Sequence, residues 1–256
     1  MIRPGGSERL AELTANLAAV RASIAAACAA AGRNSAEVQL IAVTKTFPVP
    51  DILLLHQLGV ADIGENKDQE AAPKVAACAA AGIHPRWHFV GQLQVNKAAS
   101  VASYAYMVHS VDRMRLIDAL SRRAVMAGRH EQGRELHCLL QVSLDPGRGL
   151  AGGHGLDAGL GRGGAEPGQV LDLAAAIAER DGLALAGVMA VAPLGQPARP
   201  AYARLREIAE MVRSAHPSAQ VISAGMSGDL GDAIAEGATH VRIGTALLGG
   251  RRAFVR

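Results

Sequence analysis

Short apolar runs alternate with helical segments eight times along this chain, and this rhythm limits the fold more than any other feature. The eight runs, each typical of a strand, cover residues 38–43, 60–63, 87–90, 106–109, 136–142, 183–189, 219–223 and 239–243. Runs such as LIAVT and GVMAVA are apolar almost throughout, as a strand covered on both faces requires. Strands that alternate with helices predict parallel crossovers, and eight such strands are the number that closes a barrel.

The segments between these runs have helical character. They cover residues 50–58, 67–81, 95–102, 113–127, 167–180, 199–216 and 228–236, with a short last turn after Thr245. Apolar residues spaced three and four apart over about 7–31 predict an additional N-terminal helix, which Gly32 can end. We therefore expect an α/β fold, a single (β/α)8 barrel of the TIM type over residues 1–256. An open doubly wound sheet is the alternative, because the same alternation builds it.

One glycine-rich stretch interrupts the rhythm. Residues 145–168 contain ten glycines and few apolar residues, which predicts a long loop after the fifth strand. In a parallel barrel such a loop lies on the C-terminal face, where active sites lie. It is either a disordered insertion or a functional lid.

Charge and cysteine content exclude several classes of protein. The formal net charge is +3 and the basic residues are dispersed, so we expect neither nucleic-acid nor membrane binding. Cys28, Cys78 and Cys138 lie far apart without a CxxC spacing, so we expect no disulfide framework and no metal site. The N-terminal stretch is charged and lacks the apolar segment of a secretion signal. These features predict a soluble cytoplasmic protein.

A lysine stands at the end of the first expected strand, where a barrel places its active site. Lys45 lies in IAVTKTFP, and Pro48 and Pro50 favour a helix start just beyond it. A desolvated lysine is more easily neutral, and the neutral amine attacks a carbonyl to form a Schiff base. Only four of the 26 basic residues are lysines, which weakly favours a chemical role. A surface lysine at a strand end is the alternative interpretation.

Two glycine turns after the seventh and eighth expected strands predict an anion site. VISAGMSGD and THVRIGTALLGG both run from strand through turn to helix, and we expect Ser227 to cap the first helix. The backbone N–H groups of Met226, Ser227, Gly244 and Thr245 would then be free to bind a phosphate. Arg242, just before the second turn, can donate to a phosphate or a ring nitrogen. A pair of ordinary glycine turns would look the same.

Three further polar residues lie at expected strand ends. Asn66 follows the second strand in GENK, and His88 lies near the end of the third in WHFVGQ. We interpret His88 as a hydrogen-bonded structural histidine, and Asp112 as the N-cap of the next helix.

These motifs resemble those of the pyridoxal 5′-phosphate homeostasis proteins, and they occur in the same order. The resemblance runs from about Leu40 to Arg251 through VTKTFP, IGENKDQE, WHFVGQLQVNK, SVDR, GVMAVAP, SAGMSGD and VRIGTALLG. It implies a barrel similar to the N-terminal domain of alanine racemase, with pyridoxal 5′-phosphate (PLP) as cofactor. By motif, Lys45 matches the lysine that forms the internal aldimine. The resemblance also implies cofactor contacts from Arg242, at the pyridine nitrogen, and from Asn66, Ser223, Met226, Ser227, Gly244 and Thr245.

The chain departs from the family pattern at two positions. The loop after the fifth strand usually carries a lysine followed closely by glycine, and here the nearest match is Arg162 in GRGG. Arginine cannot form a Schiff base, so we expect no covalent role for this loop. Phe47 stands where many members have another lysine.

The function that the resemblance implies is intracellular PLP homeostasis without catalytic turnover, so we assign no catalytic residue. Apo-forms of PLP-dependent enzymes are the expected recipients. An arginine at the pyridine nitrogen disfavours ring protonation, which limits reactions through a stabilised carbanion. Racemisation also needs a second base, which alanine racemase takes from a separate C-terminal domain. The sequence ends soon after Thr245, so we expect no such domain, and a monomer.

Two enzymatic alternatives remain open. One is a PLP-dependent amino-acid racemase whose second base would be Tyr104, Tyr106, Tyr202 or His88. The other is a Schiff-base aldolase that binds a sugar phosphate at the same glycine turns.

Overall fold

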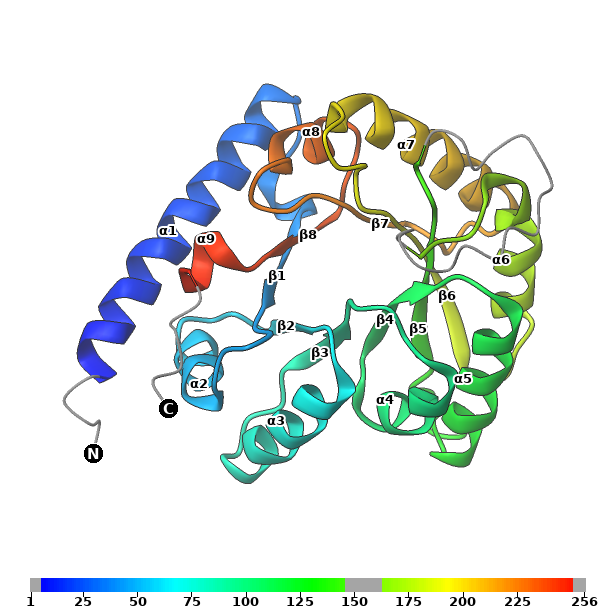
Figure 1. Ribbon diagram of the computed structural model, residues 1–256, viewed down its shortest axis with the longest axis horizontal. Helices are drawn as coiled ribbons and strands as arrows, with labels where there is room; N and C mark the ends of the chain where they lie inside the picture. Colours follow the sequence, from blue (N-terminus) through cyan, green and yellow to red (C-terminus); the bar gives the residue numbers. More distant parts are fainter. Residues whose placement is uncertain (1–5, 146–162, 251–256) are drawn as a thin grey trace.

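Eight parallel strands form a closed barrel in this computed structural model, which describes residues 6–145 and 163–250 (Figure 1). The strands are β1 (Gln39–Val43), β2 (Asp62–Glu65), β3 (Arg86–Phe89), β4 (Met107–Val111), β5 (Leu136–Gln141), β6 (Leu183–Met189), β7 (Val221–Ser223) and β8 (His240–Ile243). Each pairs with the next in the chain, and β8 closes the ring on β1 with Leu40 opposite Val241. The predicted barrel is confirmed, and the open doubly wound sheet is wrong.

Helices cover the outside of the ring. They are α1 (Gly6–Ala30), α2 (Val49–Gln57), α3 (Asp68–Ala80), α4 (Ala98–Tyr104), α5 (Met114–Met126), α6 (Val170–Ala178), α7 (Ala198–Ala215), α8 (Leu230–Ala235) and α9 (Thr245–Leu248). Short 3₁₀ turns cover Ser35–Glu37, Val95–Lys97 and Pro167–Gln169. The expected helices are therefore confirmed close to their predicted bounds. Most of the glycine-rich loop expected over 145–168, including Arg162, lies outside the described residues.

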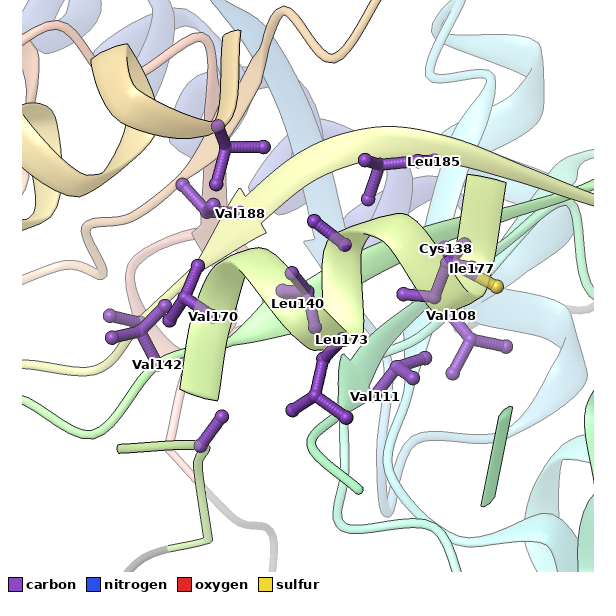
Figure 2. Packing of buried hydrophobic residues seen from close by; sticks show 14 of the residues in the cluster. Val108, Val111, Cys138, Leu140, Val142, Val170, Leu173, Ile177, Leu185 and Val188 are labelled. Atoms are coloured by element: carbon purple, nitrogen blue, oxygen red, sulfur yellow. The ribbon is translucent and has the colours of Figure 1, made fainter. Parts of the chain in front are cut away.

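The main core lies between the strands and the helices. Figure 2 shows Val170, Leu173 and Ile177 of α6 packed over Leu140 and Cys138 of β5. These side chains are at most 7% exposed, and burial of each larger one stabilises the fold by roughly 1.5–3 kcal/mol. The side chains that point into the barrel are different. A small apolar group, Met107, Leu139, Ala186 and Met189, occupies one part of the interior, and polar side chains occupy the rest.

The extra N-terminal helix covers the seam where β8 meets β1, and Figure 1 shows α1 beside α8 and α9. Its buried face consists of Leu13, Leu17, Val20, Ile24 and Cys28. The Asn16 side chain donates to the carbonyl of Leu247 at 3.0 Å, which ties α1 to α9. Of the described helices, α1 alone is long and apolar enough to span a membrane. The buried face shows instead a helix packed on the barrel.

Candidate functional site

The residues expected to form a site follow four neighbouring strands. The order around the barrel is β7, β8, β1 and β2, so the carboxyl ends of these strands adjoin one another. Ser223 ends β7, Lys45 follows β1, Asn66 follows β2, and Thr245 follows β8. The structure therefore brings residues from distant parts of the chain to one sector of the C-terminal face, where barrel enzymes bind their ligands.

Lys45 sits in a strained turn between two anchored neighbours. Thr44 is fully buried, whereas Lys45 is exposed. Thr46 has a φ of 68°, which a β-branched residue rarely adopts, and its N–H donates to the Glu70 carboxylate at 3.0 Å. The backbone on both sides of Lys45 is thus held in place by hydrogen bonds. The Lys45 amine has no hydrogen-bond or ionic partner among the described residues.

A buried ion pair anchors the end of β1 beside this turn. The Lys74 amine donates to the Glu65 carboxylate at 2.6 Å and to the Thr44 carbonyl at 2.9 Å. The Thr44 hydroxyl also donates to Glu65, at 2.6 Å. Burial raises the pKa of Glu65, and the hydrogen bonds from Lys74 and Thr44 oppose that shift. The sequence pattern does not indicate a role for Lys74, because it does not show that α3 places this side chain against β1 and β2.

Arg242 is buried inside the barrel and points to neutral acceptors. One terminal nitrogen, Nη1, donates to the Ser223 carbonyl at 2.8 Å and to the Ser223 hydroxyl oxygen at 2.7 Å. The other, Nη2, donates to the Ala190 carbonyl at 2.9 Å. Burial lowers the pKa of Arg242, although arginine stays charged. Two of the five N–H groups of a guanidinium are therefore left for a ligand.

Two polar residues that the sequence did not reveal connect to this arginine. His109 lies 3.0 Å from the Ser223 hydroxyl and 2.9 Å from His88, and His88 lies 2.9 Å from Asp62. The expectation that His88 is a hydrogen-bonded structural residue is confirmed. His109 and Asp62 could be identified only from the register of the barrel strands, because that register places the inward-pointing side chains of neighbouring strands in contact.

The turn after β7 differs in detail from the predicted cradle. Gly225 has a φ of 90°, and a Cβ there would lie 2.6 Å from the Ala233 side chain, so glycine is required. The N-cap of α8 is Asp229, so the prediction that Ser227 caps this helix is wrong. The Asp229 carboxylate accepts from the Met226 N–H at 2.5 Å and from the Tyr202 hydroxyl at 2.7 Å. The Met226 N–H is thus occupied, contrary to expectation.

The turn after β8 presents free backbone donors. Gly244 is the N-cap of α9, and its carbonyl accepts from the N–H groups of Leu247 and Leu248. In the described ranges, no acceptor is recorded for the N–H groups of Ser227, Thr245 and Ala246. Backbone donors at two adjoining turns favour an anionic group.

Asp112 does not cap α5. The N-cap of that helix is Arg113, and Asp112 instead accepts a hydrogen bond from Gln92 at 2.7 Å and pairs with Arg113. The expected N-cap role is therefore wrong, because the carboxylate turns towards the loop after β3.

The unsatisfied atoms of the site fit a PLP-like ligand. The side-chain oxygen of Asn66 is buried without a hydrogen-bond partner in the described part of the chain, so a ligand can supply the missing donor. The glycine at position 91 allows Asn66 to lie here, because a Cβ on residue 91 would be 2.1 Å from the backbone carbonyl oxygen of Asn66. An amine, free backbone donors and a guanidinium together suit a molecule with an aldehyde, a phosphate and a ring nitrogen.

Comparisons with known proteins show related sequences and folds. The family model described as "Alanine racemase, N-terminal domain" matches residues 15–252. The pyridoxal phosphate homeostasis protein of Mycobacterium tuberculosis is 44% identical over 256 residues, covering 96% of this chain and 95% of the relative. A crystal structure of an unknown protein from Bifidobacterium adolescentis superposes with a TM-score of 0.78 at 31% identity, covering 94% of this chain and 96% of that chain.

A second solved structure carries the cofactor. PipY of Synechococcus elongatus, with PLP bound, superposes with a TM-score of 0.75 at 30% identity, covering 93% of this chain and all of PipY (100%). The match to the family model and the identity to the curated relative each extend over nearly the whole chain. The chain therefore belongs to the pyridoxal phosphate homeostasis proteins, within the family of alanine racemase N-terminal domains.

Proposed function

We propose that this protein binds PLP at the C-terminal face of its barrel and serves intracellular PLP homeostasis without catalytic turnover. One observation carries the proposal: a single sector joins the Lys45 amine, free backbone donors and the buried Arg242. The PLP bound in the PipY structure supports the choice of ligand.

Each predicted site residue has a role in this proposal. The Lys45 amine attacks the aldehyde carbon of PLP, a carbon–nitrogen double bond forms, and water leaves. The N–H groups of Ser227, Gly244 and Thr245 bind the phosphate, and Arg242 donates to the pyridine nitrogen. Two further residues, Asn66 and Ser223, line the pocket, whereas Met226 contributes only its exposed side chain.

The absence of turnover is supported by the positions of the candidate second bases. The sequence has three tyrosines, and each has another partner. Tyr202 donates to Asp229 at 2.7 Å, Tyr104 contacts Asp68 at 3.4 Å, and Tyr106 packs against His137 with ring centroids 4.7 Å apart. His88 is committed to the buried hydrogen bonds with His109 and Asp62. A general base must lie within hydrogen-bond reach of the proton that it abstracts, directly or through one water.

Reduction with borohydride tests the covalent step. Purified protein mixed with PLP should develop a visible absorption band, and the reduced adduct should map to the peptide that contains Lys45. Lys45→Ala should lose both signals. Lys67→Ala, which removes an exposed lysine just after β2, is the matched control and should keep them. An adduct of wild-type yield in Lys45→Ala would overturn the assignment.

A transfer experiment tests the physiological part of the proposal. We propose that the protein is a cytoplasmic monomer that releases PLP to apo-forms of PLP-dependent enzymes. The PLP-loaded protein is mixed at equal concentration with such an apo-enzyme or with a control apo-enzyme that is not a recipient. The activity of the recipient enzyme should return faster than that of the control. Loss of deuterium from α-labelled amino acids far above the rate with free PLP would instead favour the racemase alternative.

A further inference from the structure

A continuous line of hydrogen bonds crosses the interior of the barrel and ends on Arg242. It runs from Asp62, the first residue of β2, through His88 and His109 to Ser223 and Arg242. The four contacts measure 2.9, 2.9, 3.0 and 2.7 Å. All five side chains are at most 5% exposed. The line therefore runs through the buried interior from the N-terminal end of the barrel to the candidate site.

The carboxylate at one end fixes the direction of the line. Asp62 accepts two hydrogen bonds of 2.7 Å from Arg86 and one of 2.5 Å from Gln39. Burial alone would raise the pKa of Asp62, but hydrogen bonds from His88 and Arg86 overcome it and lower the pKa to about 2. An ionised carboxylate can only accept hydrogen bonds, so Nε2 of His88 must carry a proton and donate it to Asp62.

The two imidazoles then assign the remaining protons one after another. Burial lowers the pKa of His88 and, further, that of His109, which also faces the cationic Arg242. A neutral His88 accepts through Nδ1, so His109 donates through Nε2. A neutral His109 accepts through Nδ1, so the Ser223 hydroxyl donates to it. The Ser223 oxygen is then left to accept from Arg242.

The charges around the two imidazoles favour this assignment. Around the two imidazoles lie Asp62, Arg86, Tyr106, His137, His240 and Arg242. The carboxylate lies against His88, and the guanidinium of the candidate site lies on the His109 side. A second positive charge on His109 would repel Arg242 in a medium that screens poorly. A proton on Nδ1 of His109 would also take the Ser223 oxygen as an acceptor.

We infer that His88 and His109 are positioning residues for Arg242, each as the Nε2–H tautomer, and that they hold its two unused N–H groups towards the PLP ring nitrogen. The inference rests on the proposed function for its ligand, but the tautomers belong to the protein alone. The Ser223 hydroxyl connects the histidines to the arginine, because it donates its one proton to His109 and accepts from Arg242. Hydrogen bonds that all run in one direction also polarise one another.

Nuclear magnetic resonance of the ¹⁵N-histidine-labelled protein without PLP tests the tautomers directly. We expect long-range ¹H–¹⁵N spectra at pH 7 to show both His88 and His109 protonated on Nε2 only, assigned with His88→Gln and His109→Gln. Protonation of either ring on Nδ1, or a positively charged His109, would overturn the inference. This readout requires neither PLP nor activity.

A pair of variants on β4 tests the link to the cofactor. His109→Leu removes the acceptor of the Ser223 hydroxyl, and Met107→Leu is the control on the same inward face, with an apolar environment. We expect His109→Leu to weaken PLP binding about tenfold and to shift the visible band and its pH midpoint, because the Ser223 hydroxyl that accepts from Arg242 loses its own acceptor and is no longer held in place. His109→Asn, whose side-chain oxygen can accept from Ser223, should recover part of the lost PLP affinity. Met107→Leu should behave as wild type.

The outcomes separate the two levels of the proposal. If wild-type protein forms no adduct on Lys45, the proposed function fails, whereas the tautomers of His88 and His109 can still be as inferred. If the adduct forms equally in wild type and His109→Leu, with the same affinity and spectrum, the positioning role is refuted. Should His109→Leu not fold, the tautomers in the wild-type spectrum decide.

Discussion

Thr46 shows how single residues set the geometry of the site. It has the only positive φ among the described residues other than glycine, and it directly follows Lys45. A β-branched residue in this conformation carries strain of roughly 1–3 kcal/mol. Its N–H is held by Glu70, and the preceding Thr44 by Lys74, so the turn keeps one shape around the lysine.

Thr46→Asn should therefore stabilise the protein by relieving strain in the turn. Asparagine tolerates the left-handed region, so we expect the free energy of unfolding to rise by about 1 kcal/mol. Urea unfolding of the PLP-free protein measures this change. Thr14→Asn, an exposed threonine on α1, is the control and should not stabilise. If Thr46→Asn were less stable than wild type, the turn would not store strain.

Lys74 gives a second prediction at this scale. Lys74→Met leaves the Glu65 carboxylate buried without its ionic partner, and we expect a loss of about 3 kcal/mol in the free energy of unfolding. The double variant Lys74→Met/Glu65→Leu should recover part of that loss, because no buried charge remains. Chemical denaturation of both variants measures the difference, with the exposed Lys67→Met as control. Equal stability of the single and double variants would contradict the role of the unpaired charge.

At the residue scale the sequence pattern indicates the candidate site residues at strand ends but not the residues that anchor them. Lys45 and Arg242 stand out as candidates because each lies at a strand end next to a turn signal. Their supports, Lys74 and His109, act across 30 and 114 positions of sequence, to Thr44 and Ser223 respectively. Such contacts depend on strand register and helix rotation, which periodicity does not specify.

At the scale of elements, the pattern predicted the strands and helices well but their caps poorly. Strands buried on both faces and amphipathic helices follow directly from apolar spacing. The caps at Ser227 and Asp112 were wrong because a nearby group competed: Asp229 takes the turn donor, and Asp112 accepts from Gln92. Side-chain competition of this kind is decided by tertiary contacts.

α1 has a function at this scale that its pattern alone does not show. Asn16 on α1 donates to the Leu247 carbonyl, and Arg9 donates to the Leu248 carbonyl, both at 3.0 Å. These contacts hold the C-terminal end of α9, whose other end presents the Thr245 N–H to the candidate phosphate position. The extra helix thus supports the candidate anion site from outside the barrel.

Asn16→Ala tests this support. We expect about 1 kcal/mol less stability, from the loss of one hydrogen bond, and several-fold weaker binding of PLP. Thr14→Ala, which removes only a hydrogen bond to the Leu10 carbonyl within α1, should change stability by less than about 0.5 kcal/mol and leave binding unchanged. Fluorescence titration with PLP and urea unfolding measure the two effects. Unchanged binding in Asn16→Ala would show that α9 is held without α1.

At the scale of the whole molecule, the barrel combines an apolar outer core with a polar interior. The chain has few aromatic residues, 3% in all, and the interior is filled in part by histidines and an arginine. Burial lowers the pKa of His88, His109, His137 and His240. These rings belong to different strands, so a single change in pH acts on the whole barrel.

The sign of this effect follows from proton binding. Below about pH 6.5, these histidines bind protons in the unfolded chain but stay neutral in the folded barrel, so acidification favours unfolding. Below about pH 4, protonation of Asp62, whose pKa is lowered to about 2 in the folded state, removes a further contribution. Stability should therefore be greatest above pH 6.5 and fall continuously on the acid side.

His240 allows this expectation to be measured at one ring. Burial is the main cause that lowers the pKa of His240 from 6.5 to about 4. Over pH 7 to 5, one such group makes folding less favourable by about 2 kcal/mol. His240→Gln should therefore reduce the pH dependence of the unfolding free energy by about that amount, and His84→Gln, at an exposed histidine, is the control. Urea unfolding at the two pH values measures both, and parallel curves for His240→Gln and wild type would locate the acid sensitivity in the other buried rings.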